Sequence, residues 1–392
     1  KDGSEVKVID VIQKASNKLS AELTDHPQIE AEIRTMLGNT YQNLGIYDSA
    51  QSEILKADQI IRKLYGTKSK ETAISIKSLA LIYHYKGDYE KAEDLYKKSL
   101  DMFNEVEKLP SFERALLIDA YGTLLADIGN YERSEQLTEE ALKIAESIKG
   151  SDDTQVAEIK NNLATSYNYL NKLDEAEKLY NESLIVFRKH FGEYHLRVSS
   201  VINNLAFIHI FREDHQKAIP LLLESLNIKL KVLGESHPDL ILAYSNVGST
   251  YFNISDFTNA EKFMKESVNV GLKNYDEDNI NLSRSYMWYG RVLDANKNYK
   301  ESIYYLNKAY LIRKKEFGEK NKLTLITQSL YGQTNLNAGN YNEAEQHLVA
   351  SYNGLKEISG NENEATQKTL ALLIELYKKL NSYSKLIAEK EN

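Results

Sequence analysis

Residues 79–100, LALIYHYKGDYEKAEDLYKKSL, decide the fold. Apolar and small residues recur at helical spacing on both sides of a short turn. The turn carries Gly87, which lacks the Cβ that hinders sharp reversals of the backbone. The stretch therefore predicts two packed helices, a first and a second, joined near Gly87.

The same pattern returns along the chain with a period of 42 residues. We call the residue that aligns with Tyr89 the anchor of its copy. A fixed period in unbroken register indicates a repeat architecture instead of two or three separate globular domains. The nine anchors are Tyr47, Tyr89, Tyr131, Leu173, His215, Phe257, Tyr299, Tyr341 and Tyr383.

Small residues at two fixed places in each copy predict that its two helices lie close together. Three residues after the anchor the chain has Ala50, Ala92, Ser134, Ala176, Ala218, Ala260, Ser302 and Ala344, and the pattern fails only at Leu386. Nine residues before the anchor it has Gly38, Ala80, Gly122, Ala164, Ala206, Gly248, Gly290 and Gly332.

The stretches LGNTYQNLGIYDSAQ, LALIYHYKGDYEKAEDLYKKSL and LATSYNYLNKLDEAEKLYNESL resemble tetratricopeptide repeats. The resemblance implies an all-α, right-handed α-solenoid (superhelix) of about nine helix-turn-helix units. The period exceeds the usual length of about 34 residues, and with the linker GESHPDL at 234–240 it resembles the kinesin light chain type. In that linker, Gly234 is predicted to end a helix in a left-handed conformation and Pro238 to start the next helix.

The sequence predicts that both ends of the chain form caps of the repeat array. Ile9, Ile12, Ser16, Leu19 and Leu23 share one helical face, so residues 1–28 are predicted to form a capping helix, the second helix of a repeat zero. Residues 29–392 are then the superhelix. The ninth copy lacks the small residues and becomes polar, as terminal repeats of solenoids do.

Composition narrows the classes of function. The 392 residues carry a net charge of -8 and show no basic stripe, which argues against nucleic acid as a partner. The sequence has no run of about eighteen apolar residues, the length needed to span a membrane. We therefore expect no membrane span and no direct membrane contact. With no cysteine, and with no nucleotide, hydrolase or zinc-protease motif, we expect no catalysis, no cofactor and no metal.

In tetratricopeptide repeats the first helix of each pair lines a concave wall, so the resemblance assigns wall positions here. Eleven residues before the anchor stand Asn162, Asn204 and Asn246, which we call the amide row. A primary amide both donates and accepts, so evenly spaced asparagines suit the unpaired backbone of an extended peptide. In the kinesin light chain type such asparagines bind cargo peptides, and the resemblance implies that role for these three residues. Neighbouring wall positions add Asn168, Tyr169, Phe211, Asn253, Arg284, Trp288 and Arg291.

Two points about the amide row stay open at this level. The row could instead be structural, with its amides bonded to an adjacent helix or to water. The residue before each member, Asn161 or Asn203, is predicted to lie nearer the groove edge without a fixed type, because other copies carry Thr35, Lys77, Asp119 or Met287 there.

The sequence predicts a non-catalytic scaffold that binds a peptide or protein segment, mainly through repeats 4 to 7. A second hypothesis is a regulatory arm of a larger signalling enzyme, because residues 11–51 resemble the segment that joins bacterial Ser/Thr kinase domains to their repeat tails. A chain that starts at Lys1 instead of Met fits such an excised piece. A homo-oligomer is a third hypothesis. We expect a cytoplasmic location, or an extracytoplasmic one if the chain is the C-terminal part of a membrane-anchored protein.

Overall fold

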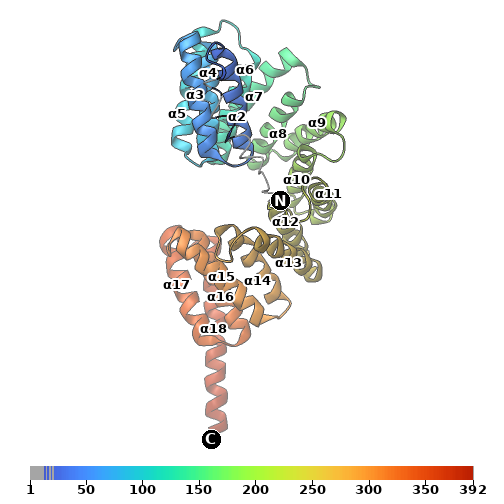
Figure 1. Ribbon diagram of the computed structural model, residues 1–392. Helices are drawn as coiled ribbons and strands as arrows, with labels where there is room; N and C mark the ends of the chain where they lie inside the picture. Colours follow the sequence, from blue (N-terminus) through green and yellow to red (C-terminus); the bar gives the residue numbers. More distant parts are fainter. Residues whose placement is uncertain (1–12, 15, 17–18, 20–21, 392) are drawn as a thin grey trace, which may run out of the picture. The chain divides into compact units, whose positions relative to one another are not determined.

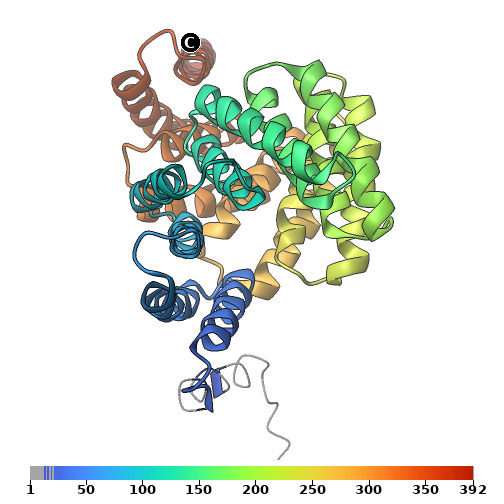
Figure 2. The same ribbon diagram turned by 90° about the horizontal axis from the view of Figure 1, so that it is seen from above.

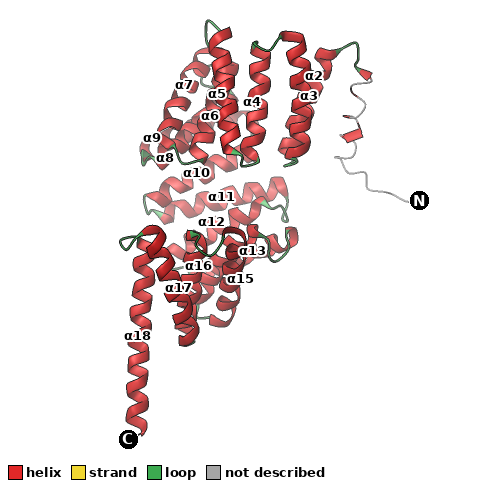
Figure 3. Cartoon of the chain, turned by 90° about the vertical axis from the view of Figure 1, so that its left-hand side faces the viewer, coloured by secondary structure: helices red, strands yellow, loops and turns green. Residues whose placement is uncertain are grey.

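The computed structural model describes residues 13–14, 16, 19 and 22–391, with side chains as far as residue 381. Every secondary-structure element in this described part is helical (Figure 3). The chain divides into two compact units, Lys1–His190 and Phe191–Asn392, and each is considered by itself. In the described part, no helix combines the length and the apolar character needed to span a bilayer.

The first unit consists of four antiparallel helix pairs that follow one another in sequence (Figures 1 and 2). The pairs are α2 (Pro27–Asn43) with α3 (Tyr47–Tyr65), α4 (Lys70–Tyr85) with α5 (Tyr89–Val106), α6 (Phe112–Asp127) with α7 (Tyr131–Lys149), and α8 (Thr154–Tyr169) with α9 (Leu173–Phe191).

The second unit continues the pattern and ends in a single helix (Figure 1). Its pairs are α10 (Leu196–Phe211) with α11 (His215–Leu233), α12 (Asp239–Asn253) with α13 (Phe257–Asn274), α14 (Ser283–Ala295) with α15 (Tyr299–Phe317), and α16 (Lys322–Ala338) with α17 (Tyr341–Ser359). A short 3-10 turn, η1 (Ile280–Leu282), precedes α14, and α18 (Glu364–Glu391) closes the chain.

The small residues pack the two helices of a pair against each other, as predicted. In all eight pairs the anchor is the first residue of the second helix. A Cβ added to Gly38 would lie 2.6 Å from Ile54, and one added to Gly290 would lie 2.6 Å from Leu306. Each glycine therefore makes room for the large residue that stands seven places after its anchor.

The turn within each pair has a positive φ two residues before the anchor. Only half of these positions are glycine: Gly45, Gly87, Gly129, Gly339, Asn171, Glu213, Ser255 and Lys297. A side chain costs free energy in this conformation. The packing on both sides of the turn must therefore impose the geometry where glycine is missing.

The glycine that ends most second helices adopts a different conformation from the one predicted. Gly234 has φ 80° and ψ 165°, so its backbone is extended after the positive φ and not left-handed helical. This region is open to glycine almost alone. Pro238 directly precedes α12, as expected of a residue that starts a helix.

Within each unit the first helices form one layer. In the first unit α6 contacts both α4 and α8, and in the second unit α14 contacts α12 and α16. Comparable contacts between successive second helices are absent from the described residues. The first helices therefore lie closest together, on the inner side of each stack, and we call this layer the wall.

The two ends differ in how they compare with the prediction. The ninth copy is one unbroken helix, α18, without the turn expected before Tyr383, and Leu373 and Leu376 of α18 are buried next to α17. A second helix would need a small residue where the chain has Leu386. At the N-terminus, Ser16 is buried and donates to Glu53, while Ile9 and Ile12 of the predicted capping helix lie outside the described residues.

Candidate ligand-binding wall

The amide row makes hydrogen bonds between neighbouring repeats. Asn162 Nδ2 donates to Asp119 Oδ1 at 3.2 Å and to Oδ2 at 3.1 Å. Asn246 Nδ2 donates to Asn203 Oδ1 at 3.2 Å. Each bond spans 43 residues, so it joins a row member to the residue twelve places before the anchor of the preceding repeat.

This finding corrects the interpretation of the first residue in each doublet. Asn203 and Asp119 were predicted to vary freely near the groove edge, yet they accept the bond from the following repeat. The sequence held a signal, because a polar acceptor stands 43 residues before each of these donors. Asn337 Nδ2 repeats the spacing with a 3.0 Å bond to Asp294 Oδ1.

The row members belong to different units, so the three-residue row stays a prediction. Asn162 is on α8 of the first unit, whereas Asn204 on α10 and Asn246 on α12 belong to the second. Asn246 is buried and Asn204 is half-buried. In Asn162 and Asn246 the amide nitrogen already donates within the protein, which supports a structural contribution beside any ligand contact.

The other predicted residue pair of the first unit lies at the end of α8. Asn168 is buried, and its Oδ1 has no hydrogen-bond partner among the described residues. Tyr169 is 55% exposed and stacks on Tyr131 with the ring centroids 4.4 Å apart. This end of the wall therefore offers an accessible aromatic ring beside a buried, unsatisfied amide oxygen.

A buried carboxylate characterises the wall of the first unit. Burial raises the pKa of Asp119 to about 7. The hydrogen bonds from Asn162 lower this pKa, whereas the negative charge of Glu158 raises it further. Lys77 of α4 is the nearby cation, and burial lowers its pKa. The electrostatic character here is acidic and sensitive to protonation near neutral pH.

In the second unit, three predicted or neighbouring wall residues form one aromatic-cation group, which we call the Trp288 cluster. The guanidinium carbon of Arg291 lies 4.1 Å from the ring centroid of Trp288 and 4.9 Å from that of Phe252. The two rings meet edge to face at 5.9 Å. Arg291 is half-buried and has no carboxylate partner in the described part of the chain.

A cavity of about 210 Å³ adjoins the Trp288 cluster. It lies on the wall, because most of its lining comes from the first helices of three successive pairs: Phe252, Arg291, Asp294, Ala295, Leu330, Gln333 and Thr334. Phe211 and Asn253, also predicted to bind ligand, are exposed at the ends of α10 and α12. Arg284 is exposed at the start of α14.

The model of the tetratricopeptide repeat family matches residues 30–105, 113–189, 197–273 and 281–357. These segments include most of the chain. The chain belongs to the tetratricopeptide repeat family.

Solved structures of other proteins show a similar fold. A signal transduction ATPase with numerous domains and a tetratricopeptide repeat sensor, from Pyrococcus horikoshii, matches with TM-score 0.61 and 15% identity over 91% of this chain and 54% of its own. The apo form of RapI matches with TM-score 0.59 and 13% identity over 90% of this chain and 98% of its own.

Kinesin light chain repeats also appear among the matches. Those of Podosopora anserina align with 18% identity and TM-score 0.47 over 52% of this chain and 96% of theirs. A search of curated protein sequences found no match. The family identifies this chain as an array of protein-interaction repeats, and such arrays present extended binding surfaces.

Proposed function

We propose that this tetratricopeptide repeat protein is a non-catalytic scaffold that binds an extended, acidic peptide segment on the wall of its second unit. The observation that carries the proposal is Arg291, a half-buried cation between Trp288 and Phe252 with no carboxylate partner among the described residues. A carboxylate of the ligand would supply the charge-assisted, bidentate hydrogen bonds that a guanidinium favours.

The surroundings of Arg291 support a peptide as the ligand. The rings of Trp288 and Phe252 hold the guanidinium by cation–π contact and add apolar surface for a neighbouring side chain of the ligand. The adjoining cavity of about 210 Å³ has room for one side chain. Asn204 and Asn246 lie in the two preceding repeats and carry amides suited to a peptide backbone.

A regulatory arm of a larger signalling protein is the second candidate. The resemblance of residues 11–51 to a linker of bacterial kinases favours it. Peptide capture on the wall would then be the sensing step, so the two candidates share one binding site.

Trp288 provides the readout, because it is the one tryptophan of the chain. Acidic and neutral peptide libraries are titrated while its fluorescence is followed. We expect the acidic set to bind more tightly and Arg291→Gln to weaken it roughly tenfold, the effect of losing one charged hydrogen-bonding group.

Two further variants separate the contributions. Lys265→Gln removes an exposed charge from α13 and should leave affinity unchanged. Asn204→Ala with Asn246→Ala tests the amide row, and unchanged affinity would remove the row from the site. The proposal as a whole fails if neutral peptides bind as well as acidic ones, or if Arg291→Gln binds like the wild type.

A further inference from the structure

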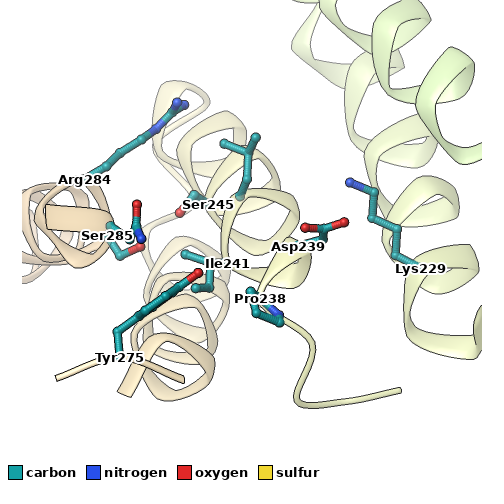
Figure 4. A pocket seen from close by; sticks show the side chains of 10 residues that line it. Lys229, Pro238, Asp239, Ile241, Ser245, Tyr275, Arg284 and Ser285 are labelled. Carbon is teal, nitrogen blue, oxygen red and sulfur yellow. The ribbon is translucent and has the colours of Figure 1, made fainter. Parts of the chain in front are cut away.

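A second, cationic pocket lies in the same unit, and none of its lining residues belongs to the Trp288 cluster. Its volume is about 280 Å³, and it lies where α12 and α14 begin (Figure 4). The lining residues are Lys229, Pro238, Asp239, Ile241, Leu242, Ser245, Tyr275, Asn281, Arg284 and Ser285. We call it the cationic pocket.

The repeat register shows that two cations here replace apolar residues. Fourteen places after the anchor, five copies carry the apolar residues Ile61, Phe103, Ala145, Phe187 and Leu355, and the sixth copy carries Gly271. In the fifth and seventh copies that position is Lys229 and Arg313. A position that is apolar in five copies has therefore become charged in two repeats, and one of these two residues, Lys229, lines the pocket.

The positive charges of this region lack counter-ions. Arg313 is buried and donates to the neutral oxygens Thr327 Oγ1 at 2.6 Å and Leu323 O at 3.4 Å. None of Lys229, Arg284 and Arg313 has a carboxylate within ion-pair distance in the described part of the chain. Burying a charge such as that of Arg313 without a counter-ion is costly.

One carboxylate lines the pocket. Figure 4 shows Asp239 at the start of α12, with Lys229 of α11 reaching towards it and Arg284 at the other end of the lining. Burial lowers the pKa of Lys229, and Asp239 partly offsets this effect. The pKa of Arg313 is lowered by burial and by the neighbouring charge of Arg284. Lys229 and Arg284 line the pocket with Asp239, and Arg313 adds its charge next to Arg284 from outside the lining. Three cations and one carboxylate leave this region with two positive charges uncompensated.

The rest of the pocket is pre-organised and adds neutral donors. Ser267 Oγ lies 2.9 Å from Ser245 Oγ and 2.7 Å from Ser285 Oγ, so a chain of hydroxyls ties α12 to α14. The Tyr275 hydroxyl and the Asn281 amide line the cavity and have no hydrogen-bond partner in the described residues. Both can donate to an anion.

We propose that the cationic pocket binds an oxyanion group with two negative charges, a phosphate monoester or a dicarboxylate, held by Lys229 and Arg284. Such a dianion would neutralise the two uncompensated charges, and the guanidinium fork of Arg284 matches its oxygens. The volume is slightly below the range of about 300–1,000 Å³ typical of drug-sized ligands, so the pocket suits a modified side chain or a small metabolite. This site does not depend on peptide binding at Arg291.

Calorimetric titration and thermal unfolding of the full chain test the proposal. The probes are O-phosphoserine and succinate at constant ionic strength, with acetate as the monovalent control. We expect saturable binding of at least one dianion and a rise in Tm on addition. Arg284→Gln and Lys229→Met should each weaken binding roughly tenfold or more.

The variants are chosen so that folding is preserved. Arg284 is exposed, and Lys229→Met places an apolar side chain where most other repeats have one. Circular dichroism checks both folds, and Lys265→Gln serves as the charge-matched control. Binding of phosphoserine alone would assign the pocket to phosphate, binding of succinate alone to carboxylates, and either supports the site.

Three results would overturn the proposal that the cationic pocket binds a dianion. The first is no saturable binding of either dianion. The second is equal binding by the Arg284→Gln and Lys229→Met variants. The third is an equal response to acetate, which would reduce the effect to general screening of charge.

Discussion

The charge of the buried Asp119 carboxyl group, and with it the stability of the protein, depends on pH. Its side chain is buried on α6 and accepts both hydrogen bonds from Asn162 Nδ2. Because burial raises its pKa to about 7, the folded protein binds a proton at this site that the unfolded chain releases at lower pH. Asp119 therefore contributes most stability below its unfolded pKa, and this contribution is lost as the pH rises through 7.

Replacement of this carboxyl group should stabilise the protein at alkaline pH. Asp119→Asn removes a buried charge at pH 8, so we expect the free energy of unfolding to increase by about 2–4 kcal/mol. The gain should shrink by about half or more at pH 5, where the wild-type carboxyl is protonated. Urea unfolding followed by circular dichroism at both pH values measures the difference.

Asp101→Asn on the exposed face of α5 is the matched control, and it should change stability little at either pH. A gain from Asp119→Asn that does not depend on pH would contradict the proposed protonation.

For single residues, the sequence predicted the position on a helix face better than the hydrogen-bond partner. The 42-residue register placed Arg291 and Trp288 on one helix face, and they are in contact. It did not reveal that Asn246 would bond to Asn203, because that bond depends on the offset between neighbouring first helices. Such an offset arises from three-dimensional packing and leaves no mark on the spacing within a single repeat.

Among the elements, the linkers and the turns use glycine for different reasons. Gly318 ends α15 with φ 86° and ψ 167°, a conformation open to glycine almost alone. Gly339 ends α16 with φ 82° and ψ 9°, the left-handed helical conformation that other residues enter at moderate cost. An added Cβ would meet nothing within 4 Å at either position.

A pair of alanine substitutions isolates this difference in backbone conformation. We expect Gly318→Ala to lower the free energy of unfolding by about 2–3 kcal/mol and Gly339→Ala to lower it by about 1 kcal/mol. Urea unfolding of the second unit, followed by Trp288 fluorescence, provides the measurement. Equal losses would show that the extended region is no more restrictive for alanine than the left-handed one.

The sequence predicted where the second helices begin more reliably than which residues form the turns. All eight anchors that begin a second helix were assigned from the period. The ninth was wrong as the start of a new helix, because a turn is favoured only when two helices can pack against each other across it. The turns at Glu213 and Lys297 also escaped prediction from residue type, since packing imposes their positive φ.

At the level of the whole molecule, contacts between helices are local in sequence. Most described helices pack against their neighbours in sequence, and several first helices also contact the next first helix, as in other solenoids. Destabilisation should therefore spread by steps within a unit.

Ile54→Ala leaves a cavity next to Gly38 in the first pair, since Ile54 is 1% exposed. We expect a loss of about 2–5 kcal/mol locally, with amide-exchange protection falling most in α2 to α4 and least in α8. Hydrogen exchange resolved by mass spectrometry measures this gradient. Leu55→Ala, at a 39% exposed position on the same helix, is the control. A uniform loss of protection across the unit would indicate all-or-none unfolding instead.

The 43-residue hydrogen bonds also limit how freely repeats could be exchanged. Asn162 donates to an acceptor that the preceding repeat supplies. If its repeat followed one with Lys77 at that position, an amide donor would face an ammonium group and lose its acceptor. Shuffling, duplication or grafting of these repeats must therefore keep the junction between two first helices intact, and the natural unit of exchange extends from the middle of one repeat to the middle of the next.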